Sequence, residues 1–183
     1  MKFVYDDGGR AAAGYHGGAG DCVTRAIAIA TGKPYQEVYD ALNALGTKER
    51  TGKRKQGTSS ARTGVHKTTT REYLESLGWT FTPTMAIGSG CKVHLRADEL
   101  PSGSLIVSVS KHLTAVIDGV SAGGIAYNAA GATGVTNIFG SYSEFLNALV
   151  TLLAPAEIVC WERGHDLTRF AVLGGLRVWT RVV

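Results

Sequence analysis

The sequence predicts a single α+β domain over residues 1–183, with N-terminal helices packed on an antiparallel sheet. Three observations support this prediction. Apolar residues recur at helical spacing as far as residue 78, and short runs rich in β-branched and aromatic residues follow from residue 79. Apolar residues make up 44% of the chain and charged residues 19%, which is typical of a protein that can bury a core.

Three helices are expected after an irregular, glycine-rich lead of about twenty residues. Asp21 is a suitable N-cap for a helix through CVTRAIAIATG that ends near Gly32. This helix has little polar surface and should therefore be central and buried. Pro34 falls in the first turn of a second helix. A capping box formed by Thr69 and Glu72 indicates the start of a third.

The strands are expected in the second half of the chain. The runs that predict them are WTFTP, SLIVSVS, HLTAVIDG, GIAYN and VTNIFG. Ser141 and Glu144 then form a capping box for a fourth helix, SYSEFLNALVTLLA. Residues 156–183 form a C-terminal strand and hairpin extension, in which TRFAVL and LRVWT flank a Gly-Gly turn.

The net charge of +4 is unevenly distributed. Residues 47–71 contain eight Lys and Arg residues against Glu49 alone. Residues 47–67 are nearly free of apolar side chains, which predicts a basic flexible loop. Clustered basic residues are what phosphate contacts need, so Lys48–Arg71 could bind nucleic acid or an acidic partner. Aromatic residues for base stacking are absent there, which favours a solvated loop or a substrate-gating flap.

Several classes of protein do not fit the sequence. It has no run of about 18 apolar residues, and its N-terminus, MKFVYDDGGR, lacks the apolar segment of a secretory signal. The three cysteines, Cys22, Cys91 and Cys160, fit neither a disulfide framework nor a zinc site. We therefore expect a cytoplasmic protein with no metal, no cofactor and no membrane contact. Cys91 and Cys160 are interpreted as small buried hydrophobic residues.

Cys22 differs because it falls in the first turn of the central helix. Unpaired backbone N–H groups and the positive end of the helix dipole surround such a position and favour a nucleophilic thiolate. A nucleophilic cysteine needs a base, and the base needs an orienting acceptor. His112 begins HLTAVIDG and Asn128 ends GIAYN. If these runs pair as a hairpin through GVSAGG, both residues can lie at one end of the sheet. Cys22, His112 and Asn128 are therefore the candidate catalytic residues.

The run GDCVTRAIAIATGKPYQEVYDAL resembles the cysteine-bearing helix of small phage-encoded proteins with a papain-like cysteine peptidase fold. SLIVSVSKHLTAVIDG resembles their histidine strand, and the His112–Asn128 spacing is similar to that of bacteriocin-processing peptidases. The resemblance covers residues 15–130. It implies a papain-like domain with Cys22 as nucleophile, His112 as base and Asn128 as orienting residue. It also implies a polypeptide substrate and, for a phage protein, the bacterial host cytoplasm or the virion.

Two positions depart from the family pattern. Papain-like enzymes usually have a Gln six residues before the Cys, whose amide helps to form the oxyanion hole; this chain has His16 there. The phage group usually has an Asp in a DTWD-like run where this chain has Asn128 followed by AAGA. The candidates for the oxyanion hole are therefore His16 and the backbone N–H of Cys22.

Three functional hypotheses follow. The first is a thiol hydrolase, with transglutaminase- or deamidase-type acyl transfer as a variant of the same chemistry. The second is a non-catalytic phage protein on the same fold, either a virion component or an inhibitor of a host factor. The third is a phosphate-binding module built on GYHGGAG, but the run lacks the Lys-Ser/Thr ending of a P-loop. Oligomeric state and substrate identity are not encoded in any recognised motif.

Overall fold

The computed structural model places the chain in two compact units, Met1–Phe145 and Leu146–Val183, which are described one at a time. The description leaves out residues 51–56, 86–87, 89, 126–132, 142–159, 164–165, 174–175 and 182–183, and the side chains of residues 160–181. The fourth helix predicted from Ser141 falls largely on these residues.

The first unit contains three helices among its described residues, close to the predicted positions. They are α1 (Cys22–Thr31), α2 (Tyr35–Thr47) and α3 (Lys67–Ser76). The end predicted for α1 is confirmed: Gly32 has φ 69°, the left-handed C-cap conformation that glycine adopts without strain. The predicted capping box of α3 is wrong, because the helix begins two residues before Thr69. The Thr69 hydroxyl donates instead to the carboxylate of Glu49, beyond the end of α2.

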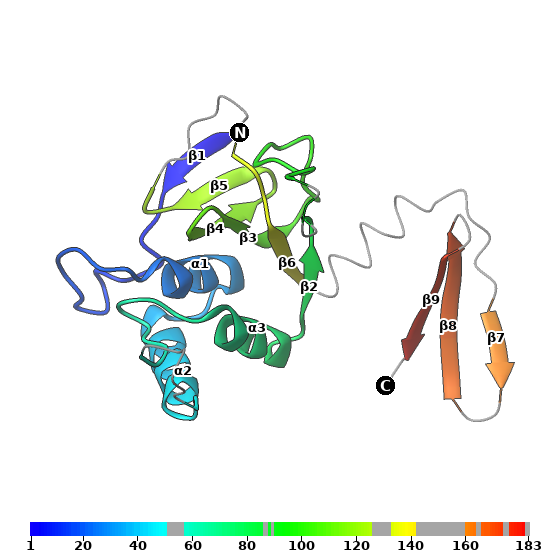
Figure 1. Ribbon diagram of the computed structural model, residues 1–183, viewed down its shortest axis with the longest axis horizontal. Coiled ribbons are helices and arrows are strands. Elements are labelled where there is room, and N and C mark those ends of the chain that lie inside the picture. Colours follow the sequence, from blue (N-terminus) through cyan, green and yellow to red (C-terminus); the bar gives the residue numbers. More distant parts are fainter. Residues whose placement is uncertain are drawn as a thin grey trace. The chain divides into compact units, whose positions relative to one another are not determined.

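Six strands of the first unit form an open mixed sheet in the order β1-β5-β4-β3-β6-β2 (Figure 1). The strands are β1 (Lys2–Tyr5), β2 (Trp79–Pro83), β3 (Ser104–Val109), β4 (His112–Ile117), β5 (Val120–Gly123) and β6 (Asn137–Ser141). The described unit is thus α+β, as predicted. An all-antiparallel sheet is wrong, because β1 pairs in parallel with β5 at one edge. The lead is therefore not irregular throughout; its KFVY run is a strand too short to stand out in the sequence.

The hairpin that begins at His112 is shorter than predicted. Asp118 and Gly119 both have positive φ, 46° and 75°, as in the tight two-residue turns that match strand twist. The return strand β5 is therefore VSAG, within the GVSAGG run that was expected to be the connection. GIAYN is not the partner of β4, and Asn128 lies outside the described residues.

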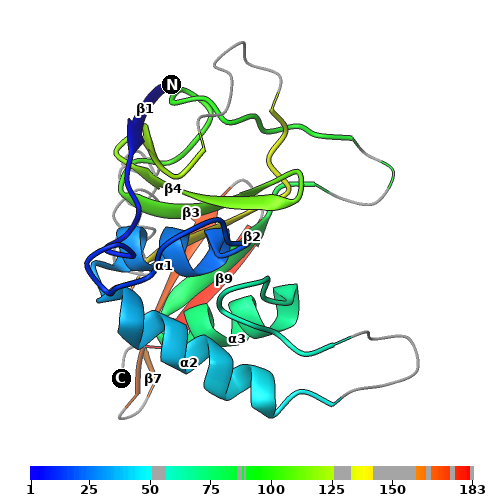
Figure 2. The ribbon, with the colours of Figure 1, turned by 90° about the vertical axis from the view of Figure 1, so that its left-hand side faces the viewer.

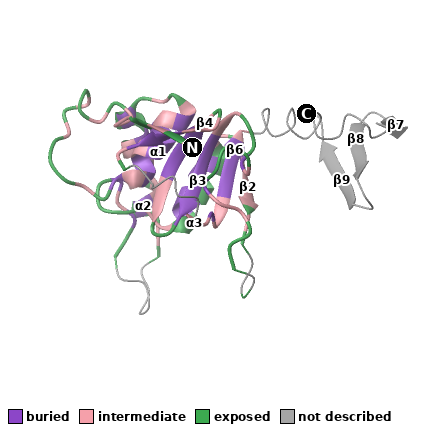
Figure 3. Cartoon of the chain, turned by 90° about the horizontal axis from the view of Figure 1, so that it is seen from above, coloured by how far each residue is buried: buried purple, intermediate pink, exposed green. Residues whose placement is uncertain are grey.

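The central strands β3 and β4 are buried on both faces of the sheet, and the three helices lie on one of these faces. Figures 1 and 2 show α1, α2 and α3 on the same side of β3 and β4. Ile106 of β3 and Ala115 of β4 pack with Ile27 of α1 in the helix-side core. Val107 and Val116, one residue further along each strand, pack in a second core on the opposite face. Buried residues accordingly run through α1 and the central strands (Figure 3).

Residues 57–66, the described part of the expected flexible loop before α3, pack against α1 and α2. Ala61 is fully buried, its N–H donates to Asn43, and its carbonyl accepts from the Thr24 hydroxyl. A Cβ at Gly46 would lie 2.3 Å from the carbonyl oxygen of Ser59, so only glycine permits this approach. The polar composition of residues 57–66 therefore did not predict the tertiary contacts that this segment makes.

The second unit contains an antiparallel sheet in the order β7-β8-β9. Its strands are β7 (Cys160–Arg163), β8 (Asp166–Leu173) and β9 (Leu176–Arg181). Leu173 pairs with Leu176, so the hairpin predicted around the Gly-Gly turn is confirmed.

Candidate active site

Cys22 is the first residue of α1, and its side chain is partly exposed. Asp21 occupies the N-cap position as predicted, but its side chain makes no capping hydrogen bond. The carboxylate turns away from the first-turn N–H groups toward other partners. The Asp21 side chain therefore leaves the first-turn N–H groups of α1 uncapped.

His112 is the first residue of β4 and is also partly buried. Because α1 packs across β4, the structure brings Cys22 and His112 to one small pocket. We call it the Cys–His pocket; its lining residues are Cys22, Arg25, Ala26, His112, Leu113, Thr114, Ala122, Gly123 and Gly124. Its volume of about 10 Å³ is roughly that of one water molecule, so a substrate would have to reach the sulfur from the open side.

The environment of His112 favours its uncharged form. Burial lowers the pKa of this imidazole below its ordinary value, and the nearby positive charge of Arg25 lowers it further. An uncharged imidazole has one unprotonated ring nitrogen, which can accept a proton. At neutral pH, His112 is therefore suited to the role of a base.

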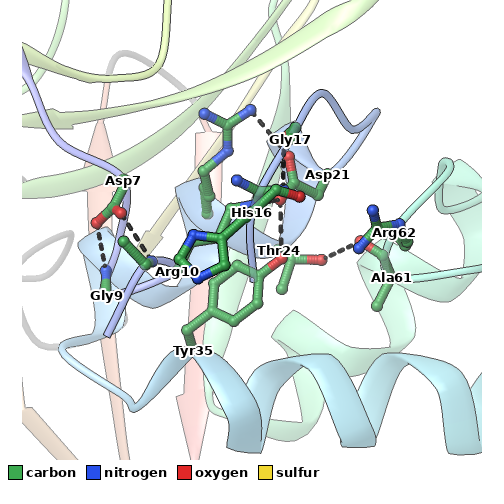
Figure 4. Close-up of polar contacts among 12 residues, drawn as sticks. Asp7, Gly9, Arg10, His16, Gly17, Asp21, Thr24, Tyr35, Ala61 and Arg62 are labelled. Atoms are coloured by element: carbon green, nitrogen blue, oxygen red, sulfur yellow. Dashed lines mark hydrogen bonds and ion pairs between the residues drawn. The ribbon is translucent and has the colours of Figure 1, made fainter. Parts of the chain in front are cut away.

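Beside the pocket lies a group of four residues that we call the Asp21 cluster: the buried Asp21 and Tyr35 and the partly buried Arg10 and Arg25. Asp21 is 1% exposed, and its Oδ2 lies 2.7 Å from Nε of Arg10 and accepts a 2.8 Å hydrogen bond from Tyr35. Its Oδ1 lies 2.9 Å from Nη2 of Arg25. Figure 4 shows Arg10 and Tyr35 converging on Asp21 at the start of α1. Burial and the bond to Asp21 raise the pKa of Tyr35, so its hydroxyl stays protonated.

The Asp21 cluster also fixes the glycine-rich lead. The guanidinium of Arg10 donates to the carbonyl oxygens of His16 and Gly17, at 3.1 and 2.8 Å. Asp7 accepts hydrogen bonds from the N–H groups of Gly9 and Ala11, and the bond from Ala11 is the main cause of the lowered pKa of Asp7. The chain approaching Cys22 is therefore held by specific polar contacts.

The remaining predicted site residues lie elsewhere. His16 is exposed and does not line the Cys–His pocket. Asn128 is outside the described residues. Cys91 is exposed, so its interpretation as a buried hydrophobic residue is wrong, and the side chain of Cys160 is not among those described.

Sequence reasoning missed Arg25, although its position contained a signal. It follows Cys22 by three residues, and side chains at this spacing share a helix face. It also missed the partners of Glu49, the lone acidic residue of the basic segment. This carboxylate accepts from the hydroxyls of Ser59 and Thr69 and lies 2.7 Å from Nδ1 of His66.

A larger cavity of about 320 Å³ lies at the other end of α1. Its described lining residues are Ala30, Thr31, Lys33, Leu77, Trp79, Ser104 and Ser141. Lys33 is the titratable residue of that set, and it is already paired with Glu37 at 2.5 Å. The smaller Cys–His pocket therefore holds the reactive side chains.

Comparison with known proteins identifies no relative. A scan against protein-family models found no match, and searches of curated proteins and of solved structures found none either. In the part of the chain that the structure describes, no helix is long and apolar enough to cross a membrane. Within that same part, no group of three or more His, Cys, Asp or Glu residues could hold a metal ion. The candidate site thus rests on the geometry of this chain.

Proposed function

We propose that the protein is a thiol hydrolase that cleaves an amide bond in a polypeptide, with Cys22 as nucleophile and His112 as base. The observation that carries the proposal is that the first residue of α1 and the first residue of β4, distant in sequence, line one pocket. The lowered pKa of His112 supports its role, because a base must be uncharged before it accepts the thiol proton.

The reaction proceeds in two stages. His112 takes the proton from the sulfur of Cys22, and the thiolate attacks the carbonyl carbon to form a tetrahedral oxyanion. The protonated imidazole then passes its proton to the leaving amine, the C–N bond breaks, and a thioester is left on Cys22. Water, activated by His112, hydrolyses the thioester and restores the thiol. An amine in place of water would make the same chain an acyltransferase.

The oxyanion needs hydrogen-bond donors at the nucleophile. The backbone N–H of Cys22 fits this role, because Cys22 is the first residue of α1 and its N–H has no acceptor within the helix. His16 remains part of the proposal only as a group that approaches with the substrate, since it is exposed and outside the pocket. Asn128 is retained as the orienting acceptor for the imidazole on the ground of the sequence resemblance.

We further infer a papain-like arrangement for the first unit. A helix that begins at the cysteine and packs on an antiparallel hairpin that begins at the histidine supports this inference. A phage origin and a cytoplasmic site of action belong to the same inference and rest on the sequence resemblance.

A non-catalytic protein on this fold is the second candidate. The observation that favours it is the size of the Cys–His pocket, which holds about one water molecule, together with the exposed position of His16. In that case Cys22 would be an ordinary thiol.

Alkylation with iodoacetamide separates the two candidates, because Cys91 serves as an internal control. Cys91 is exposed and Cys22 is only partly so, and accessibility alone would make Cys91 react faster. If Cys22 is an activated nucleophile, mass spectrometry at pH 7 will show it alkylated first, and His112→Gln will slow that reaction about tenfold or more. Preferential alkylation of Cys91 in the folded native protein would contradict the hydrolase.

A further inference from the structure

We propose that Arg25 is the positioning residue of the Cys22–His112 pair, a role that rests on the proposed function. Its guanidinium is fixed between Asp21 and Gly124 so that its positive charge acts on the thiol and the imidazole together.

The position of Arg25 is set first by its helix. Arg25 follows Cys22 by three residues on α1, so both side chains lie on one face, and both line the Cys–His pocket. Its Nη2 is 2.9 Å from Oδ1 of Asp21, a residue that is 1% exposed. Because the carboxylate is shielded from water, this ion pair is screened less than a pair between two exposed side chains.

The position of the Arg25 guanidinium is also limited by Gly124, the residue that follows β5. A Cβ added to Gly124 would lie 2.0 Å from Nη1 of Arg25 and 3.0 Å from its Cζ. The guanidinium therefore rests against the backbone of Gly124 in space that any other residue would fill. The neighbouring Gly123 is different, since a Cβ there would meet the Thr114 hydroxyl at an ordinary 3.4 Å.

The charge of this arrangement is not cancelled. Two guanidinium groups, of Arg10 and Arg25, share the single carboxylate of Asp21, and the Tyr35 hydroxyl stays protonated. The cluster by itself thus carries one net positive charge beside the start of α1. Asp7 is a further acidic group that interacts with the charge of Arg25, but its carboxylate accepts from the N–H groups of Gly9 and Ala11, and it is not among the residues lining the Cys–His pocket. Nε of Arg25 is buried and donates to no acceptor within the described part of the chain.

A positive charge acts in opposite directions on the two reacting groups. It stabilises the thiolate of Cys22 and destabilises the imidazolium of His112. The second effect is seen in the lowered pKa of His112, to which Arg25 contributes after burial. Among the described residues that line the pocket, Cys22, Arg25 and His112 are the titratable or charged ones, and β5 contributes Ala122 and Gly123. The same charge would stabilise the oxyanion as it forms.

The test measures the alkylation rate of Cys22 between pH 5 and pH 9 in the full chain. Arg25→Gln should lower the rate at pH 7 about tenfold and move the rise of the profile to higher pH, the size of effect that one neighbouring charge produces. Arg25→Lys keeps the charge and should recover most of the rate. If Arg25 had only a structural role, the folded Arg25→Gln protein would keep the wild-type pH profile, and Arg25→Lys would restore nothing.

Gly124→Ala tests whether the placement of the Arg25 guanidinium matters, because it removes no charged group from the protein. The added methyl group displaces the end of a flexible side chain, so the fold should tolerate it, and the rate at pH 7 should fall at least threefold. Gly140→Ala, in β6 and outside the Cys–His pocket, is the matched control, because a Cβ there would meet Leu105 at an ordinary 3.4 Å, and it should leave the rate unchanged. Thermal melts of all four variants separate altered reactivity from unfolding.

The outcomes distinguish this proposal from the function on which it rests. If wild-type Cys22 reacts more slowly than Cys91, both are wrong. If wild-type Cys22 reacts first but folded Arg25→Gln and Gly124→Ala proteins keep its rate and profile, the hydrolase stands and the role of Arg25 is wrong. Should Arg25→Gln not fold, an unchanged profile in Gly124→Ala is enough to overturn the role.

Discussion

The hydroxyl of Tyr35, in the first turn of α2, donates a 2.8 Å hydrogen bond to the buried carboxylate of Asp21, immediately before α1. This contact joins the two helices at the point where Cys22 begins α1. The same carboxylate binds Arg10 and Arg25, so one buried acid connects the glycine-rich lead, α1 and α2.

Tyr35→Phe tests the strength of that junction. The substitution keeps the ring and its packing against Tyr15 and Tyr39 but removes a hydrogen bond to a buried charge. We expect the free energy of unfolding to fall by about 1–3 kcal/mol, measured by chemical denaturation. Tyr39→Phe is the control and should change stability by less than about 0.5 kcal/mol, because the Tyr39 hydroxyl makes no hydrogen bond within the described residues. Equal losses in both variants would contradict the importance of the Asp21 contact.

Glu49→Gln tests whether the segment before α3 is part of the fold. The buried carboxylate of Glu49 accepts from the N–H and hydroxyl of Ser59 and from the Thr69 hydroxyl, and it contacts His66. Replacing the carboxylate with an amide removes its negative charge and places an NH2 group, itself a donor, opposite the donors of Ser59 and Thr69. We expect a loss of about 2–4 kcal/mol in denaturation experiments, and faster tryptic cleavage after Arg62.

Glu37→Gln is the matched control for Glu49→Gln. Glu37 forms an exposed ion pair with Lys33 on α2, and such pairs contribute less than about 1 kcal/mol. A Glu49→Gln protein as stable as Glu37→Gln would mean that residues 57–66 contribute little to the fold.

His112 should make stability depend on pH in a defined direction. Its pKa in the folded protein is below the unfolded value of about 6.5, so the unfolded chain binds the proton more readily. The free energy of unfolding therefore falls as the pH drops below about 6.5. We expect the wild type to gain stability relative to His112→Gln when the pH is raised from 5.5 to 7.5. A difference between the two proteins that is independent of pH would contradict the burial of His112.

Local sequence signals predicted the elements of the fold better than they predicted the polar contacts. The apolar spacing around Ile27 and the glycine at position 32 were enough to predict α1, and the short run of β-branched residues in SLIVSV predicted β3. In contrast, β1 is only four residues long and pairs with a strand more than a hundred residues away. Its pattern is too short to distinguish from an irregular lead.

The candidate site shows the same division. Cys22 and His112 were predicted from their positions at element ends, and the structure brings them to one pocket. Asp21 was predicted to cap α1 with its side chain, since Asp is a common N-cap. The structure pairs it instead with Arg10, which comes from a turn earlier in the lead, and no local spacing reveals that competition.

Cys22→Ala separates a working thiol from a structural one. The substitution removes one sulfur atom at the start of a helix, where Ala is well tolerated, and Cys22 is only partly buried. We therefore expect the free energy of unfolding to change by no more than about 1 kcal/mol, which would be seen as a small shift in the melting temperature. Hydrolysis of any substrate should disappear, because no other side chain in the pocket can form a thioester.

His112→Ala should reduce the rate to a similar degree, since nucleophile and base act as one unit. An assay of the biological effect of each variant, run beside the thermal melts, provides the readout before a substrate is known. Full function in a well-folded Cys22→Ala protein would favour the non-catalytic candidate, and loss of function without loss of stability would favour the hydrolase.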